Sequence, residues 1–123
     1  MSRILMIDDD KDFSALASAH FSRLGHEMHL ADNGRDGLAL AAAVKPDVIL
    51  LDIMMPEVNG IEVLRELQSG DDTSGIPVVI VSGKFFDQGM LDVFSQEPNF
   101  KAFLGKPVAL AALQQKVESL LKR

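Results

Sequence analysis

The segment Val48-Ile49-Leu50-Leu51-Asp52-Ile53-Met54-Met55-Pro56-Glu57-Val58-Asn59-Gly60 decides the fold of this chain. An apolar run of four residues ends at the carboxylate of Asp52, and a loop with Pro56 and Gly60 leads into a helical pattern. A buried parallel strand delivers a single charged side chain to the carboxyl edge of its sheet in this way. Open α/β sheets bind their ligands at that edge, so the segment predicts both an α/β fold and a site at Asp52.

A second apolar run, Ile4–Ile7, ends in two further acids, Asp8 and Asp9. Three carboxylates at one sheet edge repel one another, and such a cluster persists when a divalent cation neutralises it. Ligands that are all oxygen, without Cys or His, favour Mg²⁺ or Mn²⁺. The sequence therefore predicts an acidic, metal-binding pocket formed by Asp8, Asp9 and Asp52.

Apolar runs alternate with helical patterns five times along the chain. Strict alternation of this kind predicts a parallel sheet that is covered by helices on both faces. The strands are expected at Arg3–Ile7, Glu27–Ala31, Asp47–Leu51, Val78–Ser82 and Ala102–Leu104. The helices are expected at Asp12–Leu24, Arg35–Val44, Gly60–Ser69, Gln88–Ser95 and Leu110–Leu121.

The composition of the strands predicts their order in the sheet. The runs at 4–7, 48–51 and 78–81 are apolar throughout, as expected of strands that are buried on both faces. The second strand includes the polar His29 and the fifth is short, so both are expected at the edges. We therefore predict a doubly wound, flavodoxin-like (βα)5 three-layer sandwich with strand order 2-1-3-4-5. The order reverses between the first and third strands, which are the two that end in the acids.

Size and composition restrict the class of protein. A chain of 123 residues with 47% apolar and 24% charged residues is long enough for a real core, and we expect a single domain over residues 1–123 without an output domain. The net charge of −6 and the lack of a basic stripe argue against direct binding to nucleic acid. The sequence has no cysteine, no signal-peptide pattern and no long apolar span, so we expect a cytoplasmic protein that does not bind membranes.

Two more strand ends carry residues that are suited to binding phosphate. The fourth strand ends in Ser82, and the fifth leads through Gly105 into Lys106. Each residue alone has a common explanation, since Ser often ends a strand in a turn and Lys is usually solvated. Their joint occurrence at successive strand ends adds a hydroxyl donor and an ammonium group to the acidic pocket.

Together these motifs resemble the receiver domain of response regulators in two-component signalling. The resemblance covers essentially the whole chain: the acid pair after the first strand, LLDIMMPEVNG after the third, VSG after the fourth and the Lys-Pro pair after the fifth. It implies a phosphorylation switch rather than a true enzyme, with only weak activity in its own phosphorylation and dephosphorylation. It also implies a phosphohistidine partner, either a sensor histidine kinase or a histidine phosphotransfer protein, and a downstream effector that the sequence does not name.

The resemblance implies a role for each matched residue. Asp52 would be the phosphoacceptor, Lys106 would pair with the phosphoryl oxygens, and Ser82 would donate its hydroxyl to them and move inward. Phe103 stands at the position of the family's rotating aromatic switch, where Tyr is more usual. Pro107 stands where the family often has a cis peptide bond.

For the metal, the resemblance implies Mg²⁺ as the cofactor, with Mn²⁺ as a substitute. Asp9, Asp52 and the backbone carbonyl of Met54 would be ligands, and Asp8 would act partly through water. Movement of the two switch residues would then reshape the surface of the fourth helix, fifth strand and fifth helix. Homodimerisation through that surface occurs in the family, and the sequence leaves it open.

Three other functions compete with this one. A phosphatase of the haloacid-dehalogenase type would use Asp8 as nucleophile and Asp10 as acid/base, but Asp12 stands where that family has Thr or Val. A flavodoxin-like cofactor carrier needs a phosphate loop rich in Ser, Thr and Gly after the first strand, whereas the acids there would repel a phosphate. A receiver-fold adaptor that acts without phosphorylation is opposed only by the completeness of the pocket. For Asp10 and Asp12 we adopt a simpler role, which is to cap the first helix.

Overall fold

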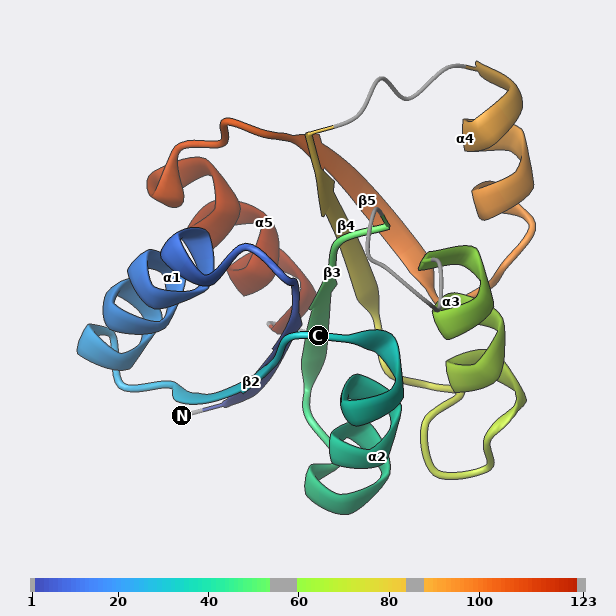
Figure 1. Ribbon diagram of the computed structural model, residues 1–123, viewed down its shortest axis with the longest axis horizontal. Coiled ribbons are helices and arrows are strands. Elements are labelled where there is room, and N and C mark those ends of the chain that lie inside the picture. Colours follow the sequence, from blue (N-terminus) through green and yellow to red (C-terminus); the bar gives the residue numbers. More distant parts are fainter. Residues whose placement is uncertain (1, 54–59, 84–87, 122–123) are drawn as a thin grey trace.

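The protein forms a parallel five-stranded sheet with helices on both faces (Figure 1). A computed structural model describes residues 2–53, 60–83 and 88–121. The strands are β1 (Arg3–Ile7), β2 (Glu27–Ala31), β3 (Val48–Leu51), β4 (Val78–Ser82) and β5 (Phe100–Gly105). The helices are α1 (Lys11–Arg23), α2 (Gly34–Val44), α3 (Gly60–Ser69), α4 (Gln88–Ser95) and α5 (Leu110–Leu121). The strand order is β2-β1-β3-β4-β5, which confirms the predicted doubly wound, flavodoxin-like arrangement.

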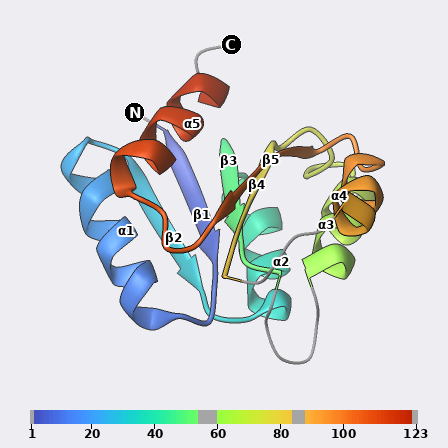
Figure 2. The same cartoon turned by 90° about the horizontal axis from the view of Figure 1, so that it is seen from above.

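Helices α1 and α5 cover one face of the sheet, and α2, α3 and α4 cover the other (Figures 1 and 2). Two separate hydrophobic clusters fill the two interfaces. Because alternate residues of a strand point to opposite faces, Leu5 and Ile7 belong to the cluster that faces α2, α3 and α4. Ile4 and Met6 belong to the cluster that faces α1 and α5. The inner strands are therefore buried on both sides, as their composition predicts.

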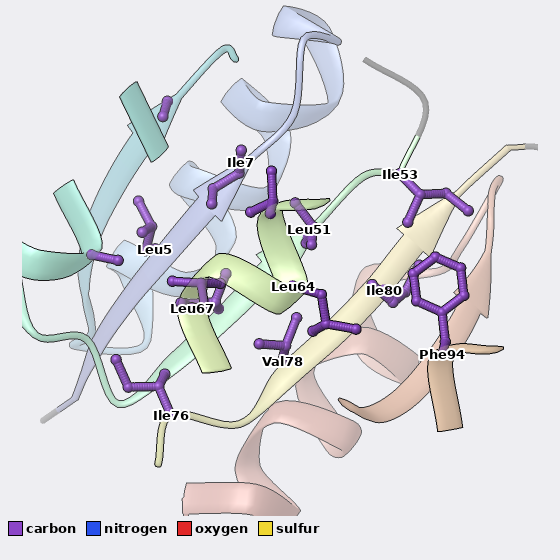
Figure 3. Packing of buried hydrophobic residues seen from close by; sticks show 14 residues of the cluster. Leu5, Ile7, Leu51, Ile53, Leu64, Leu67, Ile76, Val78, Ile80 and Phe94 are labelled. Carbon is purple, nitrogen blue, oxygen red and sulfur yellow. The ribbon is translucent and has the colours of Figure 1, made fainter. Parts of the chain in front are cut away.

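The cluster under α3 and α4 holds these helices on the sheet (Figure 3). Leu64 and Leu67 of α3 and Phe94 of α4 are at most 4% exposed and share this cluster with Val78 and Ile80 of β4. Burial of each such side chain contributes about 1.5–3 kcal/mol to folding. This packing holds β3 and β4, whose ends carry part of the candidate site.

Glycine at position 60 allows α3 to begin directly against the end of β3. A Cβ on Gly60 would lie 2.4 Å from the Cα of Ile53, which is closer than van der Waals contact permits. The N–H of Gly60 also donates a hydrogen bond of 3.2 Å to the carbonyl of Ile53. This close approach positions the backbone one residue beyond Asp52.

Asp10 and Asn33 cap the two helices that flank β2. The side chain of Asp10 accepts a hydrogen bond from the N–H of Phe13 at 3.1 Å, and that of Asn33 accepts one from the N–H of Asp36 at 2.8 Å. Each bond satisfies an amide group that has no partner within its own helix. The predicted capping role of Asp10 is confirmed, and Asp12 lies in the first turn of α1, where an acid suits the helix dipole.

Strand β5 is longer than its apolar run suggests. It covers Phe100–Gly105 rather than Ala102–Leu104, because pairing with β4 continues in both directions. Gly105 pairs with Ser82, the last residue of β4. The end of β5 is therefore level with the end of β4, immediately before Lys106.

Other differences from the predicted boundaries are small. Helix α1 lies one residue earlier than expected and α2 begins one residue earlier, since their caps precede them directly, while β3 begins one residue later. The remaining elements have the predicted bounds. Met54, whose carbonyl is a predicted ligand, lies outside the described residues, so that prediction stays open. In the described ranges, the helices are too short or too polar to cross a membrane.

Candidate functional site

The carboxyl ends of β1 and β3 bring three carboxylates together. Asp8, Asp9 and Asp52 each offer an oxygen, and these three atoms lie within 4.8 Å of one another. The backbone of two of them extends the sheet: the N–H of Asp8 donates to the carbonyl of Ala31 at 3.0 Å, and that of Asp52 donates to Ile7 at 2.9 Å. The predicted convergence of the acids at one sheet edge is therefore present in the structure.

Asp8 is the most enclosed of the three acids. Its side chain is 1% exposed and accepts hydrogen bonds from the N–H of Asp10 at 2.9 Å and from the Nζ of Lys106 at 2.7 Å. Burial and, to a smaller extent, the charge of Asp52 raise the pKa of Asp8 from its ordinary 3.8 to about 6, although the two hydrogen bonds act in the opposite direction. Asp52 is also buried, whereas Asp9 is exposed. The cluster is thus a buried carboxylate pair that is open to solvent on the side of Asp9.

Lys106 is the cation of this cluster. Its Nζ lies 2.7 Å from Oδ2 of Asp8, 3.5 Å from Oδ2 of Asp52 and 3.8 Å from Oδ2 of Asp10. Its backbone N–H donates to the carbonyl of Ser82 at 2.8 Å, so the backbone pairing of β5 with β4 continues to this residue. Burial lowers the pKa of Lys106, but the hydrogen bond to Asp8 and the neighbouring carboxylates outweigh burial and raise it. The ammonium group therefore stays charged at neutral pH. The peptide bond to Pro107 is cis, as predicted.

An aromatic ring from α1 supports the same lysine. The Nζ of Lys106 lies 4.8 Å from the centroid of the Phe13 ring, within the range of a cation–π interaction. We expected Asp10 only to cap the first helix and assigned no role to Phe13. Neither contact with Lys106 has a signal in chain spacing, because the fold alone brings α1 beside the connection from β5 to α5.

The two predicted switch residues lie in different surroundings. Ser82 ends β4, is fully buried, and belongs to the same sheet edge as the acids. Phe103 is opposite Ile80 in the pairing of β5 with β4. Its half-buried ring packs against the cluster under α3 and α4. Ser82 thus lies at the level of the site, and Phe103 lies two residues before the end of β5.

The donor set at this edge fits a small divalent cation. Three carboxylates against one ammonium leave two negative charges that the described side chains of the cluster do not compensate. The available donors are all oxygens, which Mg²⁺ and Mn²⁺ prefer. Asp8, Asp9 and Asp52 could therefore hold such an ion, and a bound cation would relieve the repulsion between Asp8 and Asp52.

The chain is similar to known proteins along nearly its whole length. A family model described as response regulator receiver domain matches residues 4–118. Protein PilH of Pseudomonas aeruginosa is 39% identical over 121 residues, which cover 98% of each chain. The response regulator MprA of Mycolicibacterium vanbaalenii is 35% identical over 122 residues, which cover 98% of this chain and 51% of MprA. The chain therefore spans nearly all of one curated relative and about half of the other.

Solved structures share the fold. The receiver domain of the Francisella response regulator 1452 has a TM-score of 0.88 and 28% identity, with 100% of this chain and 98% of that chain covered. The chemotaxis protein CheY4 of Vibrio cholerae has a TM-score of 0.90 and 22% identity, with 98% of each chain covered. At that identity, the likeness to CheY4 concerns the fold alone.

Proposed function

This chain belongs to the response regulator receiver domain family, and on that premise we propose that Asp52 accepts a phosphoryl group and thereby acts as a signalling switch. The observation that carries the proposal is the position of Asp52. It directly follows β3 and lies beside two other carboxylates, with the Nζ of Lys106 3.5 Å from its Oδ2. A carboxylate beside a fixed cation is a suitable nucleophile for this transfer, because the cation offsets the charge that arrives with the phosphoryl group.

The donor in this proposal is the phosphohistidine of a sensor histidine kinase or of a histidine phosphotransfer protein. An oxygen of Asp52 attacks the phosphorus in line with the P–N bond, and the P–O bond forms as the P–N bond breaks. The electron pair returns to the imidazole nitrogen of the partner. Lys106, whose pKa is raised, stays protonated and stabilises the charge on the phosphoryl oxygens.

Mg²⁺ suits the same site, with Mn²⁺ as a substitute. Asp9 and Asp52 would hold the ion together with the carbonyl of Met54, and Asp8 would act partly through water. When bound, the ion supplies positive charge near the transferred group. Asp8 has a second role in this arrangement, since its 2.7 Å hydrogen bond keeps Lys106 at the pocket.

Phosphorylation changes the charge of the pocket, and Ser82 and Phe103 are proposed to respond. A phosphoryl group replaces one negative charge on Asp52 by about −1.5 to −2. The hydroxyl of Ser82 and the ammonium of Lys106 are donors at the neighbouring strand ends. Movement of Ser82 toward the new oxygens would open space for the ring of Phe103. The surface of α4, β5 and α5 would then change and bind an effector, with only weak phosphorylation and dephosphorylation activity of the protein's own.

The remaining parts of the proposal concern the setting of the switch. Residues 1–123 are proposed to act as one receiver unit in the cytoplasm, where a phosphohistidine partner is accessible. The acidic net charge of −6 supports partners that are proteins rather than nucleic acid or membrane lipids. Homodimerisation through α4, β5 and α5 is left open.

The competing phosphatase and adaptor functions are less well supported. Both oxygens of Asp8 accept hydrogen bonds, Oδ1 from the N–H of Asp10 and Oδ2 from Lys106. These two short hydrogen bonds withdraw electron density from both oxygens of Asp8 and disfavour its attack in a haloacid-dehalogenase type of reaction. An adaptor that acts without phosphorylation would not need Lys106 beside Asp52.

Intact-protein mass after incubation with acetyl phosphate and Mg²⁺ tests the proposal. We expect a single phosphoryl adduct that requires Mg²⁺, is absent in Asp52→Ala and is retained in Asp12→Asn, which changes an exposed acid on α1. An adduct that survives Asp52→Ala but is lost in Asp8→Ala would favour the phosphatase. No adduct, together with no binding of beryllofluoride, would favour the adaptor.

A further inference from the structure

A groove of about 740 Å³ lies between α1 and α2, across the edge strand β2. The two helices lie on opposite faces of the sheet, and β2 runs between them as the outermost strand (Figures 1 and 2). Pockets that bind small molecules usually measure about 300–1,000 Å³ and are lined mainly by apolar side chains with a few polar groups. The size of this groove is therefore that of a small-molecule site.

The walls of the groove are apolar and small. Helix α2 presents Ala39, Leu40 and Ala43 on one stripe, and α1 faces them with Ala15. Leu30 of β2 also lines the groove and is 44% exposed. These residues would make favourable contacts with an apolar body, and no described side chain covers them.

One buried polar group in the groove has no partner. Ser14 of α1 lines the groove and is 7% exposed, and its Oγ has no hydrogen-bond partner among the described residues. A buried hydroxyl without a partner costs free energy, so such groups are nearly always satisfied by protein, water or ligand. The Oγ is itself shielded from solvent, so it can accept a hydrogen bond from a donor in the groove once the Ser14 side chain turns toward the groove.

The charges around the groove favour a cation. Asp32 and Asp36 are exposed acids on its rim, and Asp8 lies at the end that adjoins the acidic cluster. Among the described residues that line the groove, Lys11 is the one cation. The side-chain amide of Asn33 donates to both rim acids at 2.9 and 3.0 Å, so their carboxylates are held together. The charge of Asp8 is paired with Lys106, which leaves the two exposed rim carboxylates against one ammonium, and this balance attracts a positive group and repels an anion.

We infer that this groove, here named the α1–α2 groove, binds a small organic cation with an apolar body, such as an aryl-alkyl amine. The apolar body contacts the alanines and Leu30, while the ammonium group lies toward Asp32 and Asp36 and can donate to Ser14 once that side chain turns toward the groove. The inference does not rest on phosphorylation of Asp52. It assigns the receiver a second input site, next to the acidic cluster, because Asp8 lines both.

Two-dimensional amide NMR spectra of the whole chain with Mg²⁺ present test the inference. The probes are phenethylamine, phenethyl alcohol and hydrocinnamate, which share one apolar body and differ in charge. We expect saturable shifts of the amide resonances of Ser14, Leu30 and Ala39. The affinity should decrease from the amine to the alcohol to the carboxylate. Shifts from the amine that are confined to Asp9 and Asp52 would overturn the inference, because they would mean attraction to the acidic cluster alone. Equal binding of amine and carboxylate, or no saturable binding, would also overturn it.

Two pairs of variants locate the site. Ala39→Trp fills the groove and should abolish the shifts, whereas Ala42→Trp, on an exposed position of the same helix outside the groove, should leave them unchanged. Asp36→Asn should weaken the binding of the amine about fivefold, as expected for the loss of one exposed ion pair, without changing the binding of the alcohol. Glu66→Gln, an exposed acid on α3, is its control. Equal effects of the two tryptophan variants would place the binding elsewhere and refute the inference.

Discussion

The Nζ of Lys106 donates a hydrogen bond of 2.7 Å to Oδ2 of Asp8, and the two side chains are only 16% and 1% exposed. Removing one partner of a buried ion pair leaves an uncompensated charge, at a cost on the order of 3–5 kcal/mol. In Mg²⁺-free buffer we therefore expect Lys106→Met to lower the free energy of unfolding by about 3 kcal/mol in urea titrations. Lys101→Met, at an exposed position of β5, should change it by less than about 0.5 kcal/mol. Equal losses in the two variants would contradict a structural role for the pair.

The raised pKa of Asp8 predicts how stability depends on pH without Mg²⁺. The pKa of Asp8 is about 6 in the fold, above its ordinary 3.8, so the folded state binds this proton more tightly than the unfolded chain. The resulting stabilisation is complete below pH 3.8 and is lost as pH rises through about 6. It amounts to at most about 3 kcal/mol. The side chain introduced by Asp8→Asn cannot ionise, so this variant should not lose stability through that group as pH rises.

Urea titrations at a series of pH values measure the effect as the difference between Asp8→Asn and wild type. That difference should shift in favour of the variant between pH of about 4 and 7, because other acids titrate in both proteins and cancel. A difference that stays constant over this range would show that the pKa of Asp8 is not raised.

The fold and the meeting of the site residues were predictable from local sequence. Fully apolar runs at 4–7, 48–51 and 78–81 belong to strands that are buried on both faces, and the polar His29 marks an edge strand. Since parallel strands end at a common edge, residues that follow them converge whatever their distance along the chain. This rule was enough to bring Asp8, Asp52 and Lys106 together.

Side-chain geometry within the site was not predictable in the same way. Which acid Lys106 binds more closely depends on rotamers and burial, and these have no periodic signature in the sequence. The contact of Phe13 with Lys106 requires α1 to lie beside the end of β5, which is a tertiary relationship. The full length of β5 likewise follows from pairing with β4 rather than from its own apolar run.

The ring of Phe13 is expected to stabilise Lys106 through its π electrons as well as its apolar area. Phe13→Leu keeps an apolar side chain but removes the ring that lies 4.8 Å from Nζ. A double-mutant cycle with Lys106→Met, measured by urea unfolding, should give a coupling energy of about 0.5–1 kcal/mol. A cycle of Leu16→Ala with Lys106→Met should give none, because Leu16 is 61% exposed on the same helix. A coupling energy of zero in the Phe13 cycle would show that the ring does not stabilise Lys106.

Gly60 should tolerate alanine poorly although it begins a helix. Alanine has the higher helix propensity, but its Cβ would meet the Cα of Ile53 at 2.4 Å and force the backbone to move. We expect Gly60→Ala to lower the free energy of unfolding by about 1–3 kcal/mol and to shift the amide resonance of Asp52. Gly75→Ala, where a Cβ would meet nothing within 4 Å, is the matched control. A neutral Gly60→Ala would mean that α3 can move away from β3 without cost.

Mg²⁺ should stabilise the protein through the three carboxylates. A ligand that binds only the folded state raises the free energy of unfolding by about 2.7 kcal/mol when its concentration is a hundred times its dissociation constant. Asp9 is the exposed member of the cluster, and no ion pair between Asp9 and Lys106 is found among the described residues. Asp9→Asn should therefore reduce the stabilisation by Mg²⁺ while leaving the stability of the metal-free protein nearly unchanged. Asp71→Asn, an exposed acid far from the cluster along the chain, should respond like wild type. Thermal unfolding with and without Mg²⁺ measures this stabilisation. If Mg²⁺ stabilises Asp9→Asn as much as wild type, Asp9 is not a ligand. If Mg²⁺ does not stabilise wild type, Lys106 is the principal counter-ion of the cluster.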